Sequence, residues 1–297
     1  MIINFIKRTR KKLIILLAFD LLSFGKYQLL KLVQKKLLIP TFMAWYNKYR
    51  PQTFHDVIGQ ELVKTVLQNA IIKNKVKNAY LFSGPKGTGK TTLARIFANT
   101  LNSDLPLEIL EKNSQNWTKK NQTQIDIIEM DAASNTGIDD VRMLIDNAQN
   151  PPMIAKHKIY IIDEVHMLSK SAMNALLKIL EEPPHYLIFL LCTTNPEKLL
   201  PTVLSRLTHL KLTSHTIENL NQKLVEIAKL ENISIDQESL QIIAKRAGGG
   251  QRDAINLLET VASFELKNYT AKEVSQFLGV VSDQLFEEVG DYLLHNT

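Results

Sequence analysis

The stretch that most constrains the fold is the glycine-rich run "GPKGTGKTT", residues 84–92. It lies between a short apolar run, "AYLFS", and a stretch of helical character, "LARIFANTL". It matches the pattern G-x-x-x-x-G-K-[ST], in which a loop leads from a strand into a helix. Backbone N–H groups of such a loop can surround a phosphate chain, and the helix N-terminus adds a partial positive charge. The sequence therefore predicts a phosphate-binding loop rather than an ordinary glycine turn.

The pattern also assigns roles within the loop. Lys90 is expected to reach the β- and γ-phosphates, and Thr91 is expected to ligate Mg²⁺. The other loop residues expected to contact the nucleotide are Gly84, Pro85, Lys86, Gly87, Thr88, Gly89 and Thr92.

A second motif supplies carboxylates. The apolar run "KIYIIDEVH" ends in Asp163 and Glu164, and adjacent carboxylates at a strand end are costly unless they have a role. Asp163 suits a Mg²⁺ ligand that acts through water, and Glu164 suits the base that orients an attacking water. Together with the loop, these residues predict a site that hydrolyses ATP or GTP.

Strand and helix patterns alternate from residue 79 to about 212. Apolar runs of strand length occur at 79–83, 125–130, 158–163 and 186–192, with few charges, as expected for strands covered on both faces. Helical patterns lie between them, one of them with Ser169 as its cap. This alternation predicts an α/β fold, a parallel sheet flanked by helices. The one cysteine, Cys192, lies in the last run and is expected to be a buried core thiol.

The second half of the chain has a different pattern. Residues 216–279 show only helical periodicity, with "GGG" at 248–250 ending one helix and Thr270 and Glu273 forming a capping-box pattern. We therefore expect an α/β domain at 43–215 and a small all-helical domain at 216–279. A further helix begins in 280–297, and the polar stretch 103–124 is expected to be a loop.

The net charge of +6 comes from one end of the chain. Residues 1–42 hold nine basic residues and one acid, which leaves 27 basic and 29 acidic residues, a net of −2, for the rest. Overall charge therefore gives no argument for nucleic-acid binding. The basic, apolar extension of residues 1–42 is interpreted first as a start codon assigned too early, with a surface helix and a targeting segment as alternatives. No membrane association is expected.

Six motifs in order carry a family resemblance: "YNKYRPQTFHDVIGQE", "FSGPKGTGKTTLARIFANTLN", "DAASNTGIDDVR", "IIDEVHMLSKSAMNALLKILEEPP", "LLCTTNPEKLLPTVLSRL" and "GGGQRDAINLLE". Together they resemble the gamma/tau family of bacterial DNA polymerase III, the AAA+ ATPase of the sliding-clamp loader. The resemblance covers about residues 44–279. It implies an AAA+ domain followed by a helical lid, and ATP and Mg²⁺ as ligands.

The resemblance implies further site residues. The segment that would wrap the adenine and ribose contributes Tyr49, Arg50, Pro51, Val57 and Ile58. Thr194, followed by Asn195, resembles the first sensor near the γ-phosphate. Arg206 in "LSRL", with Leu207 where the family has cysteine, would act in trans on a neighbouring subunit. Arg252 resembles the second sensor and would bind ATP in cis, with Gln251 near the base.

The family resemblance also implies partners, which are the sliding clamp, other loader subunits in a ring of five, and primer–template DNA held through its phosphates in the cytoplasm. Candidates for DNA contact are Lys156, Lys158 and the "SNT" at 134–136, although a solvated surface explains these lysines equally well. Because residues 103–124 contain no cysteine, the family's four-cysteine zinc module is expected to be absent. From its length, the segment 280–297 is expected to hold only the start of the family's collar domain, which assembles the ring.

Three rivals remain on the sequence alone. A branch-migration helicase motor would share the phosphate loop. A partner or regulatory subunit would keep the fold without a working loader, and a truncated remnant is the third possibility.

Overall fold

The computed structural model describes residues 43–112, 125–134, 137–264 and 269–279. The predicted N-terminal extension at 1–42, the start of a collar at 280–297 and part of "SNT" lie outside the described residues. The described residues from Trp45 onward belong to one unit by their backbone contacts, and all the features below lie in it.

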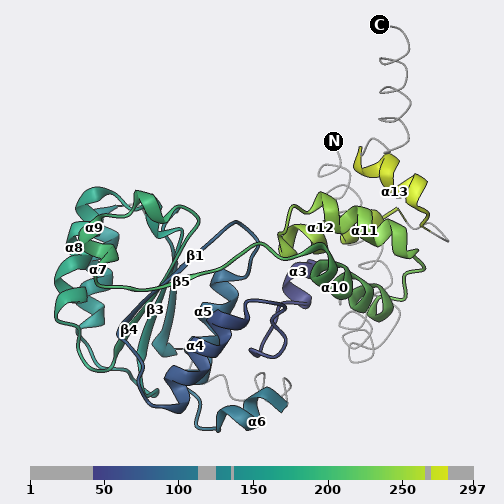
Figure 1. Ribbon diagram of the computed structural model, residues 1–297. Helices are drawn as coiled ribbons and strands as arrows, with labels where there is room; N and C mark the ends of the chain where they lie inside the picture. The colour runs from purple at the N-terminus through teal and green to yellow at the C-terminus, as the bar shows by residue number, and fades with distance from the viewer. Residues whose placement is uncertain (1–42, 113–124, 135–136, 265–268, 280–297) are drawn as a thin grey trace, which may run out of the picture. The chain divides into compact units, whose positions relative to one another are not determined.

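A five-stranded sheet forms the centre of the α/β domain, with strand order β2-β3-β4-β1-β5 and every neighbouring pair parallel (Figure 1). The strands are β1 (Ala79–Ser83), β2 (Ile127–Asp131), β3 (Lys158–Asp163), β4 (Leu187–Thr193) and β5 (Thr208–Lys211). The predicted parallel sheet is confirmed, and each of the four predicted apolar runs contributes a strand.

The edge strands differ from the sequence expectation. Strand β5 was not predicted, because it has four residues and only Leu210 among them is buried. Strand β2 was expected to be covered on both faces, but it is an edge strand without fully buried residues. Its Glu129 pairs with Arg95 at the surface. The edge position explains both differences, since an edge strand has a neighbour on one side only.

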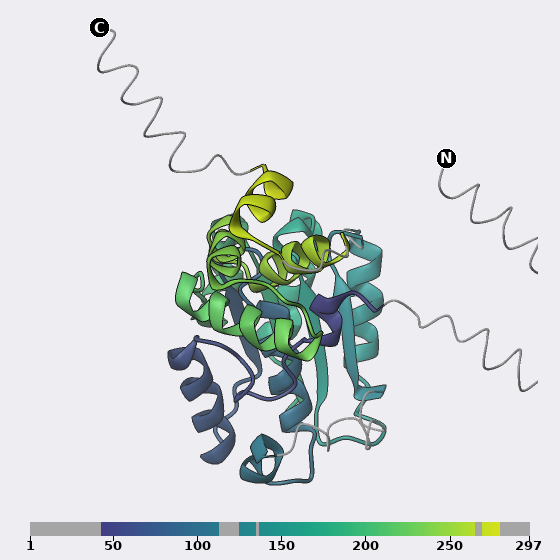
Figure 2. The same ribbon diagram turned by 90° about the vertical axis from the view of Figure 1, so that its right-hand side faces the viewer.

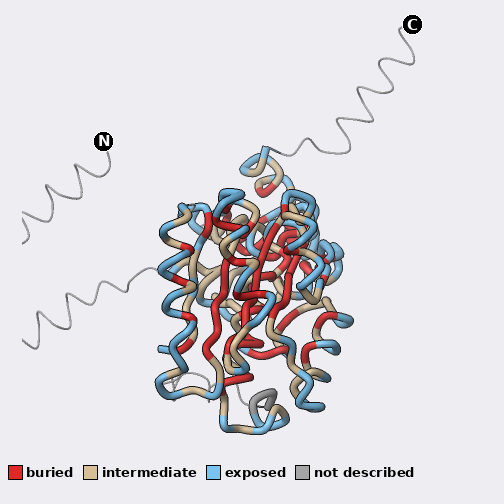
Figure 3. Tube along the Cα trace, turned by 90° about the vertical axis from the view of Figure 1, so that its left-hand side faces the viewer, coloured by how far each residue is buried: buried red, intermediate tan, exposed pale blue. Residues whose placement is uncertain are grey.

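Helices cover both faces of the sheet (Figure 1). One face packs on α7 (Ile138–Ala148), α8 (Lys170–Glu181) and α9 (Pro201–Leu204), and the other packs on α4 (Glu61–Ile72) and α5 (Lys90–Leu101). Alternate residues of each central strand enter opposite cores, so Tyr160 and Ile162 face one layer and Ile159 and Ile161 the other. Figure 3 shows the buried strands inside a shell of partly exposed helices. Each fully buried Leu or Phe contributes about 1.5–3 kcal/mol.

Local sequence determines where several helices begin. The Ser169 hydroxyl accepts a hydrogen bond from the N–H of Ala172, which confirms the predicted cap of α8.

Cys192 is fully buried as predicted, and burial raises the pKa of its thiol well above the ordinary value. The expected loop at 103–124 is wrong in part, since α6 (Leu107–Lys112) forms there. Leu107 packs against the core on the α5 side, which gives this polar stretch an apolar anchor.

The helices of the C-terminal half pack together, as Figure 2 shows in green and yellow. They are α10 (Ile217–Leu230), α11 (Gln237–Arg246), α12 (Gln251–Ala262) and α13 (Ala271–Leu278), and they share a core of their own. Thr270 and Glu273 form the predicted capping box. Gly248 and Gly249 have φ of 59° and 85° and end α11, as "GGG" indicated. The domain boundary at 215/216 stays a prediction.

The segment before the sheet contains α3 (Trp45–Lys48), and short 3₁₀ turns follow β3 and β4 at η3 (Val165–Met167) and η4 (Pro196–Lys198). Within the described part of the chain, none of the helices is both long enough and apolar enough to cross a membrane.

Candidate active site

The phosphate loop connects β1 to α5 and depends on glycine at two close contacts. Gly84 has φ of 148°, and a Cβ there would lie 2.5 Å from the carbonyl oxygen of Leu212. Gly87 has φ of 76°, and a Cβ there would lie 3.0 Å from Cα of Gly250 in the lid. Both positions therefore exclude larger residues, and the second brings the lid against the loop.

Lys90, the first residue of α5, lies inside the loop with only 6% of its surface exposed. Its Nζ donates hydrogen bonds of 2.9 Å to the carbonyl oxygens of Gly84 and Pro85. Burial lowers the pKa of the Lys90 amine, and the nearby Glu164 carboxylate opposes that shift. A cation held by two neutral carbonyls gains a stronger partner when a phosphate enters, so this arrangement favours anion binding.

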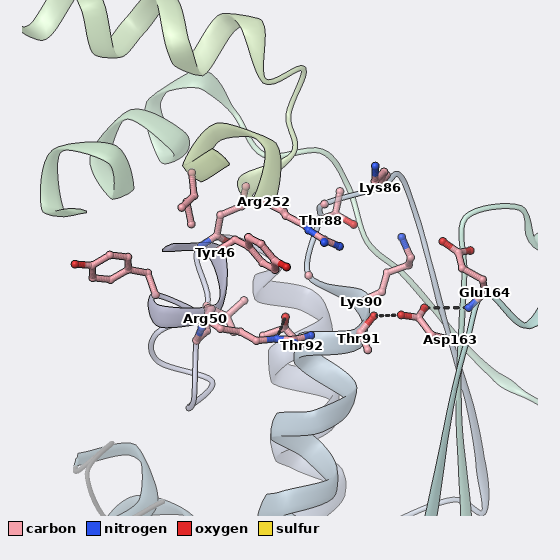
Figure 4. A pocket seen from close by; sticks show the side chains of 17 residues that line it. Tyr46, Arg50, Lys86, Thr88, Lys90, Thr91, Thr92, Asp163, Glu164 and Arg252 are labelled. Atoms are coloured by element: carbon pink, nitrogen blue, oxygen red, sulfur yellow. Dashed lines mark hydrogen bonds between the residues drawn. The ribbon is translucent and has the colours of Figure 1, made fainter. Parts of the chain in front are cut away.

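Asp163, at the end of β3, is fixed by both of its oxygens. The Thr91 hydroxyl donates to Oδ2 at 2.7 Å, and the Glu164 N–H donates to Oδ1 at 3.0 Å (Figure 4). A hydroxyl and a carboxylate side by side are hard oxygen ligands of the kind that Mg²⁺ prefers. The residues predicted to hold Mg²⁺ are thus adjacent and chemically suited to it.

Glu164 has an unusual backbone, with φ of 47° and ψ of 42°. This left-handed conformation costs a non-glycine residue about 1–2 kcal/mol. Oε2 of its carboxylate accepts a hydrogen bond of 3.2 Å from the Thr194 hydroxyl, which follows β4. The strained turn thus keeps the carboxylate at the edge of the sheet, where it lines the cavity described next.

One cavity brings together four distant parts of the chain: the segment at 46–57, the phosphate loop, the acid pair Asp163 and Glu164, and the first turns of α12 (Figure 4). Its lining consists of Tyr46, Tyr49, Arg50, Pro51, Val57, Lys86, Gly87, Thr88, Gly89, Lys90, Thr91, Thr92, Asp163, Glu164, Gln251, Arg252 and Ile255. Tyr46 and Ile255 were not predicted from the sequence. The predicted site residues outside this lining are Gly84, Pro85, Ile58, Thr194, Asn195 and Arg206.

Two guanidinium groups line the cavity. Arg50 donates from Nε to the Thr92 hydroxyl at 3.1 Å, and burial, followed by the nearby Arg95, lowers the pKa of its guanidinium. Arg252 lies over the Tyr46 ring, 4.4 Å from its centroid. Because a guanidinium is charged at any ordinary pH and suits phosphate, this pair favours a polyanionic ligand.

The lid is attached to the cavity at two places. The Gln251 N–H donates to the Gly87 carbonyl at 3.0 Å, and its side chain is buried. The Tyr49 hydroxyl donates to Glu231, which caps the end of α10. Tyr49 therefore connects the segment before the sheet to the lid as well as lining the cavity.

Arg206 lies away from the cavity of its own chain. It donates from Nη2 to Glu181 and from Nη1 to the Thr202 carbonyl, each at 2.6 Å, and its side chain is 34% exposed. This arrangement leaves the predicted trans role as a proposal. Thr194 lies next to the acid pair instead, since its hydroxyl contacts Glu164, and Asn195 is linked to Glu164 only through that hydroxyl.

Lys158 does not present its amine at the surface, as the suggested DNA contact would require. It is buried and donates to the carbonyl oxygens of Asn147 and Asn150 at the end of α7, where a cation complements the helix dipole. Lys156 is exposed and pairs with Asp104 at 3.5 Å.

Within the described residues, no three His, Cys, Asp or Glu side chains gather as a metal site. The zinc prediction stays a prediction, because 113–124 lie outside those residues.

Comparison with known proteins agrees with this geometry. Residues 59–216, more than half of the chain, match the family model "DNA polymerase III, delta subunit". Residues 219–262 match "DNA polymerase III clamp loader subunit, ATPase lid domain". The chain belongs to the DNA polymerase III clamp-loader family. The gamma/tau resemblance in the sequence is confirmed by the relatives below.

Three relatives illustrate the similarity of this clamp-loader chain. It is 42% identical to DNA polymerase III subunit tau of Bacillus subtilis over 82% of this chain and 43% of that protein. It is 42% identical to subunit tau/gamma of Haemophilus influenzae over 86% and 37%, and to subunit tau of Escherichia coli over 82% and 38%. The chain thus spans less than half the length of these three relatives.

Solved structures show the AAA+ fold. The RuvB Holliday junction branch migration motor of Thermotoga maritima superposes with a TM-score of 0.58 at 24% identity, covering 78% of this chain and 72% of that one. Its K64R mutant gives a TM-score of 0.59. This chain thus shares the fold of these motors.

Proposed function

We propose that this chain binds ATP with Mg²⁺ and hydrolyses it as a motor subunit of a clamp loader. The observation that carries the proposal is the single cavity lined by Lys90, by the Thr91–Asp163 pair, by Glu164 and by Arg252. A cation, hard oxygen ligands, a base and a second cation in one cavity are the parts that phosphoryl transfer to water requires.

In this proposal each part of the cavity has its own role in binding. The loop amides and Lys90 hold the β- and γ-phosphates, and Thr91 and Asp163 hold Mg²⁺, which when bound neutralises phosphate charge. Tyr49, Arg50, Pro51 and Val57 contact the adenosine part, and Arg252 reaches the phosphates from the lid. Because these groups come from the α/β domain and from the lid, binding is expected to fix the angle between the two.

For hydrolysis, Glu164 accepts a proton from the attacking water, and Thr194 lies where it can sense the γ-phosphate. Arg206 would enter the cavity of a neighbouring subunit, exchanging its contact with Glu181 for the transferred phosphate. Charge supplied in this way accelerates phosphoryl transfer by about 10³–10⁵-fold in arginine-finger systems. Hydrolysis is thereby coupled to assembly.

The proposed partners follow from the family. ATP binding would arrange this chain with other loader subunits, in a ring of five as in the family, to open a sliding clamp and hold primer–template DNA in the cytoplasm. Contacts to DNA phosphates would be sensitive to salt and independent of sequence. Hydrolysis would then release the clamp on the DNA.

The test is to measure ATP and GTP binding and hydrolysis by the purified chain, alone and with partner subunits, sliding clamp and primer–template DNA. We expect Mg²⁺-dependent binding of ATP and hydrolysis that DNA and clamp together stimulate. ATP binding without any stimulation would favour a regulatory subunit over a working loader. A chain without affinity for Mg-ATP would overturn the proposal.

A further inference from the structure

His166 lies behind Glu164 and takes no part in the roles assigned above. It is the middle residue of the 3₁₀ turn η3, and its side chain is only 8% exposed, against 33% for Glu164. Its Nδ1 lies 3.0 Å from the hydroxyl oxygen of Thr193 and 3.3 Å from Oε2 of Glu164. A largely buried imidazole therefore connects the end of β4 to the proposed catalytic base.

The hydrogen-bond partners around Nδ1 favour one tautomer of the ring. If Nδ1 accepted a hydrogen bond from Thr193, its lone pair would lie beside the Glu164 carboxylate and repel it. If Nδ1 carries the proton, it donates to the Thr193 hydroxyl oxygen and presents a positive hydrogen near Oε2. Thr193 can accept this bond together with the one that its hydroxyl oxygen receives from the Asn195 N–H at 3.1 Å. The Nδ1–H form is thus the one that suits both neighbours.

The same carboxylate oxygen also accepts from Thr194. The Thr194 hydroxyl has one hydrogen and two acceptors, Oε2 of Glu164 at 3.2 Å and Oδ1 of Asn195 at 2.9 Å. When that hydrogen turns to Asn195, His166 remains beside Oε2. Among the described residues, no hydrogen bond or ion pair engages Oε1.

We propose that His166 is a positioning residue for Glu164: its Nδ1–H, held by Thr193, keeps Oε2 at the end of β4 and leaves Oε1 to take the proton of the attacking water. Because the Gly84 N–H donates to the Thr193 carbonyl at 3.3 Å, the phosphate loop shares this anchor. A shift of the loop is therefore passed to the base through Thr193 and His166.

The inference rests on the proposed ATPase function, and the test separates the two. The single-turnover rate of ATP hydrolysis and the affinity for ATP are measured for the full chain assembled with its partner subunits, because the proposed hydrolysis depends on a neighbouring subunit. His166→Gln moves the donor away from the Nδ1 position, whereas the shorter amide side chain introduced by His166→Asn keeps a donor near it. We expect His166→Gln to lower the rate about 10- to 100-fold, as a misplaced catalytic group does, with ATP affinity within about twofold. His166→Asn should recover most of the rate.

A double-mutant cycle distinguishes positioning from a general structural effect. In a Glu164→Gln background, His166→Gln should cost no further rate, because the group that it positions is gone. An equal loss in both backgrounds, or no loss in the wild-type background, would overturn the inference. The matched control is His185→Gln, because His185 is an exposed histidine before β4. This variant should keep the wild-type rate.

Two further outcomes are decisive. If His166→Gln does not fold, Thr193→Val removes the hydroxyl that holds the ring at nearly the same volume. Thr193→Val should also lower the hydrolysis rate when Glu164 is present and cost no further rate in the Glu164→Gln background. A wild-type rate for Thr193→Val would overturn the inference. A wild-type chain that binds ATP but never hydrolyses it, even when assembled with its partner subunits, would overturn the proposed ATPase function and the inference together.

Discussion

The backbone N–H of Gln251, the first residue of α12, donates a hydrogen bond of 3.0 Å to the carbonyl oxygen of Gly87 in the phosphate loop. The preceding residue, Gly250, lies so close that a Cβ on Gly87 would meet its Cα at 3.0 Å. The helix that carries Arg252 therefore begins directly on the loop, and a change in the loop is expected to move this helix.

Gly87→Ala tests this contact. Its left-handed backbone should cost about 1–2 kcal/mol of stability, and the clash with Gly250 should also displace α12 and weaken ATP binding. Gly248→Ala is the control, because it has a left-handed backbone of φ 59° but no atom within 4 Å of the added Cβ. Thermal unfolding and ATP titration of both variants check the prediction. Equal ATP affinity in the two variants would contradict it.

Lys90→Ala and Arg206→Ala should separate binding from turnover. Loss of the buried Lys90 amine should weaken ATP binding by about 10- to 100-fold, as expected for a charge-assisted contact, and abolish turnover. Arg206→Ala should leave affinity within about twofold while lowering DNA-stimulated turnover in the assembled loader by about 10³-fold or more. If both variants weaken binding to the same extent, the trans assignment of Arg206 is wrong.

Tyr46 is expected to act through its ring. The Arg252 guanidinium lies over the ring face, so Tyr46→Leu should release Arg252 and weaken ATP binding about two- to fivefold, the value of an exposed cation–π contact. Tyr46→Phe keeps the face and should bind as the wild type does. A loss of affinity in Tyr46→Phe would show that the hydroxyl, not the ring, matters. Equilibrium ATP titration of the two variants decides between these results.

Much of the fold was predictable because the central strands are buried on both faces and read as continuous apolar runs. Strand β5 was not, since a four-residue edge strand with one buried side chain is defined by its pairing with β1 rather than by its own composition. Helix α6 was not predicted for a similar reason. It lies in a polar stretch, and its Leu107 packs against a core formed by residues distant in the sequence.

The site was predictable where it is local in sequence. The phosphate loop and the acid pair are each continuous motifs, and the structure brings both to one cavity. Tyr46 and Ile255 were missed because they join the cavity only when segments some 200 residues apart meet. His166 gave no separate signal within "DEVH", because only the 3₁₀ turn after β3 directs its imidazole toward Thr193.

Asp126 gives a prediction about stability and pH. It is buried just before β2, and its oxygens accept from the N–H groups of Met153, Ile154 and Ala155 at 2.7–2.9 Å. Burial raises the pKa of the Asp126 carboxyl, but these three bonds outweigh it and the pKa lies below its ordinary value. In Asp126→Asn, the side-chain amide presents N–H hydrogens to the three backbone N–H donors. The variant should lower the free energy of unfolding by about 1–3 kcal/mol.

The sign of the pH dependence follows from the lowered pKa. A carboxyl with a lower pKa in the folded state adds stability above its unfolded pKa of about 3.9, and this stability is lost as the pH falls through the folded value. The difference between wild type and Asp126→Asn should therefore be constant from pH 7 to about 5 and shrink below about 4. Urea unfolding at each pH measures it. Asp104→Asn, which removes an exposed pair, is the control and should have little effect at any pH.

Strand order has one more consequence. The phosphate loop follows β1 and the acid pair stands at the end of β3, and both strands border β4. Their ends are thus two inter-strand spacings apart, roughly 10 Å, a width that main-chain hydrogen bonds set regardless of the side chains. The sheet therefore fixes the distance between the loop that binds the phosphates and the carboxylate that orients the attacking water. The sequences of the loops can diverge without changing this distance.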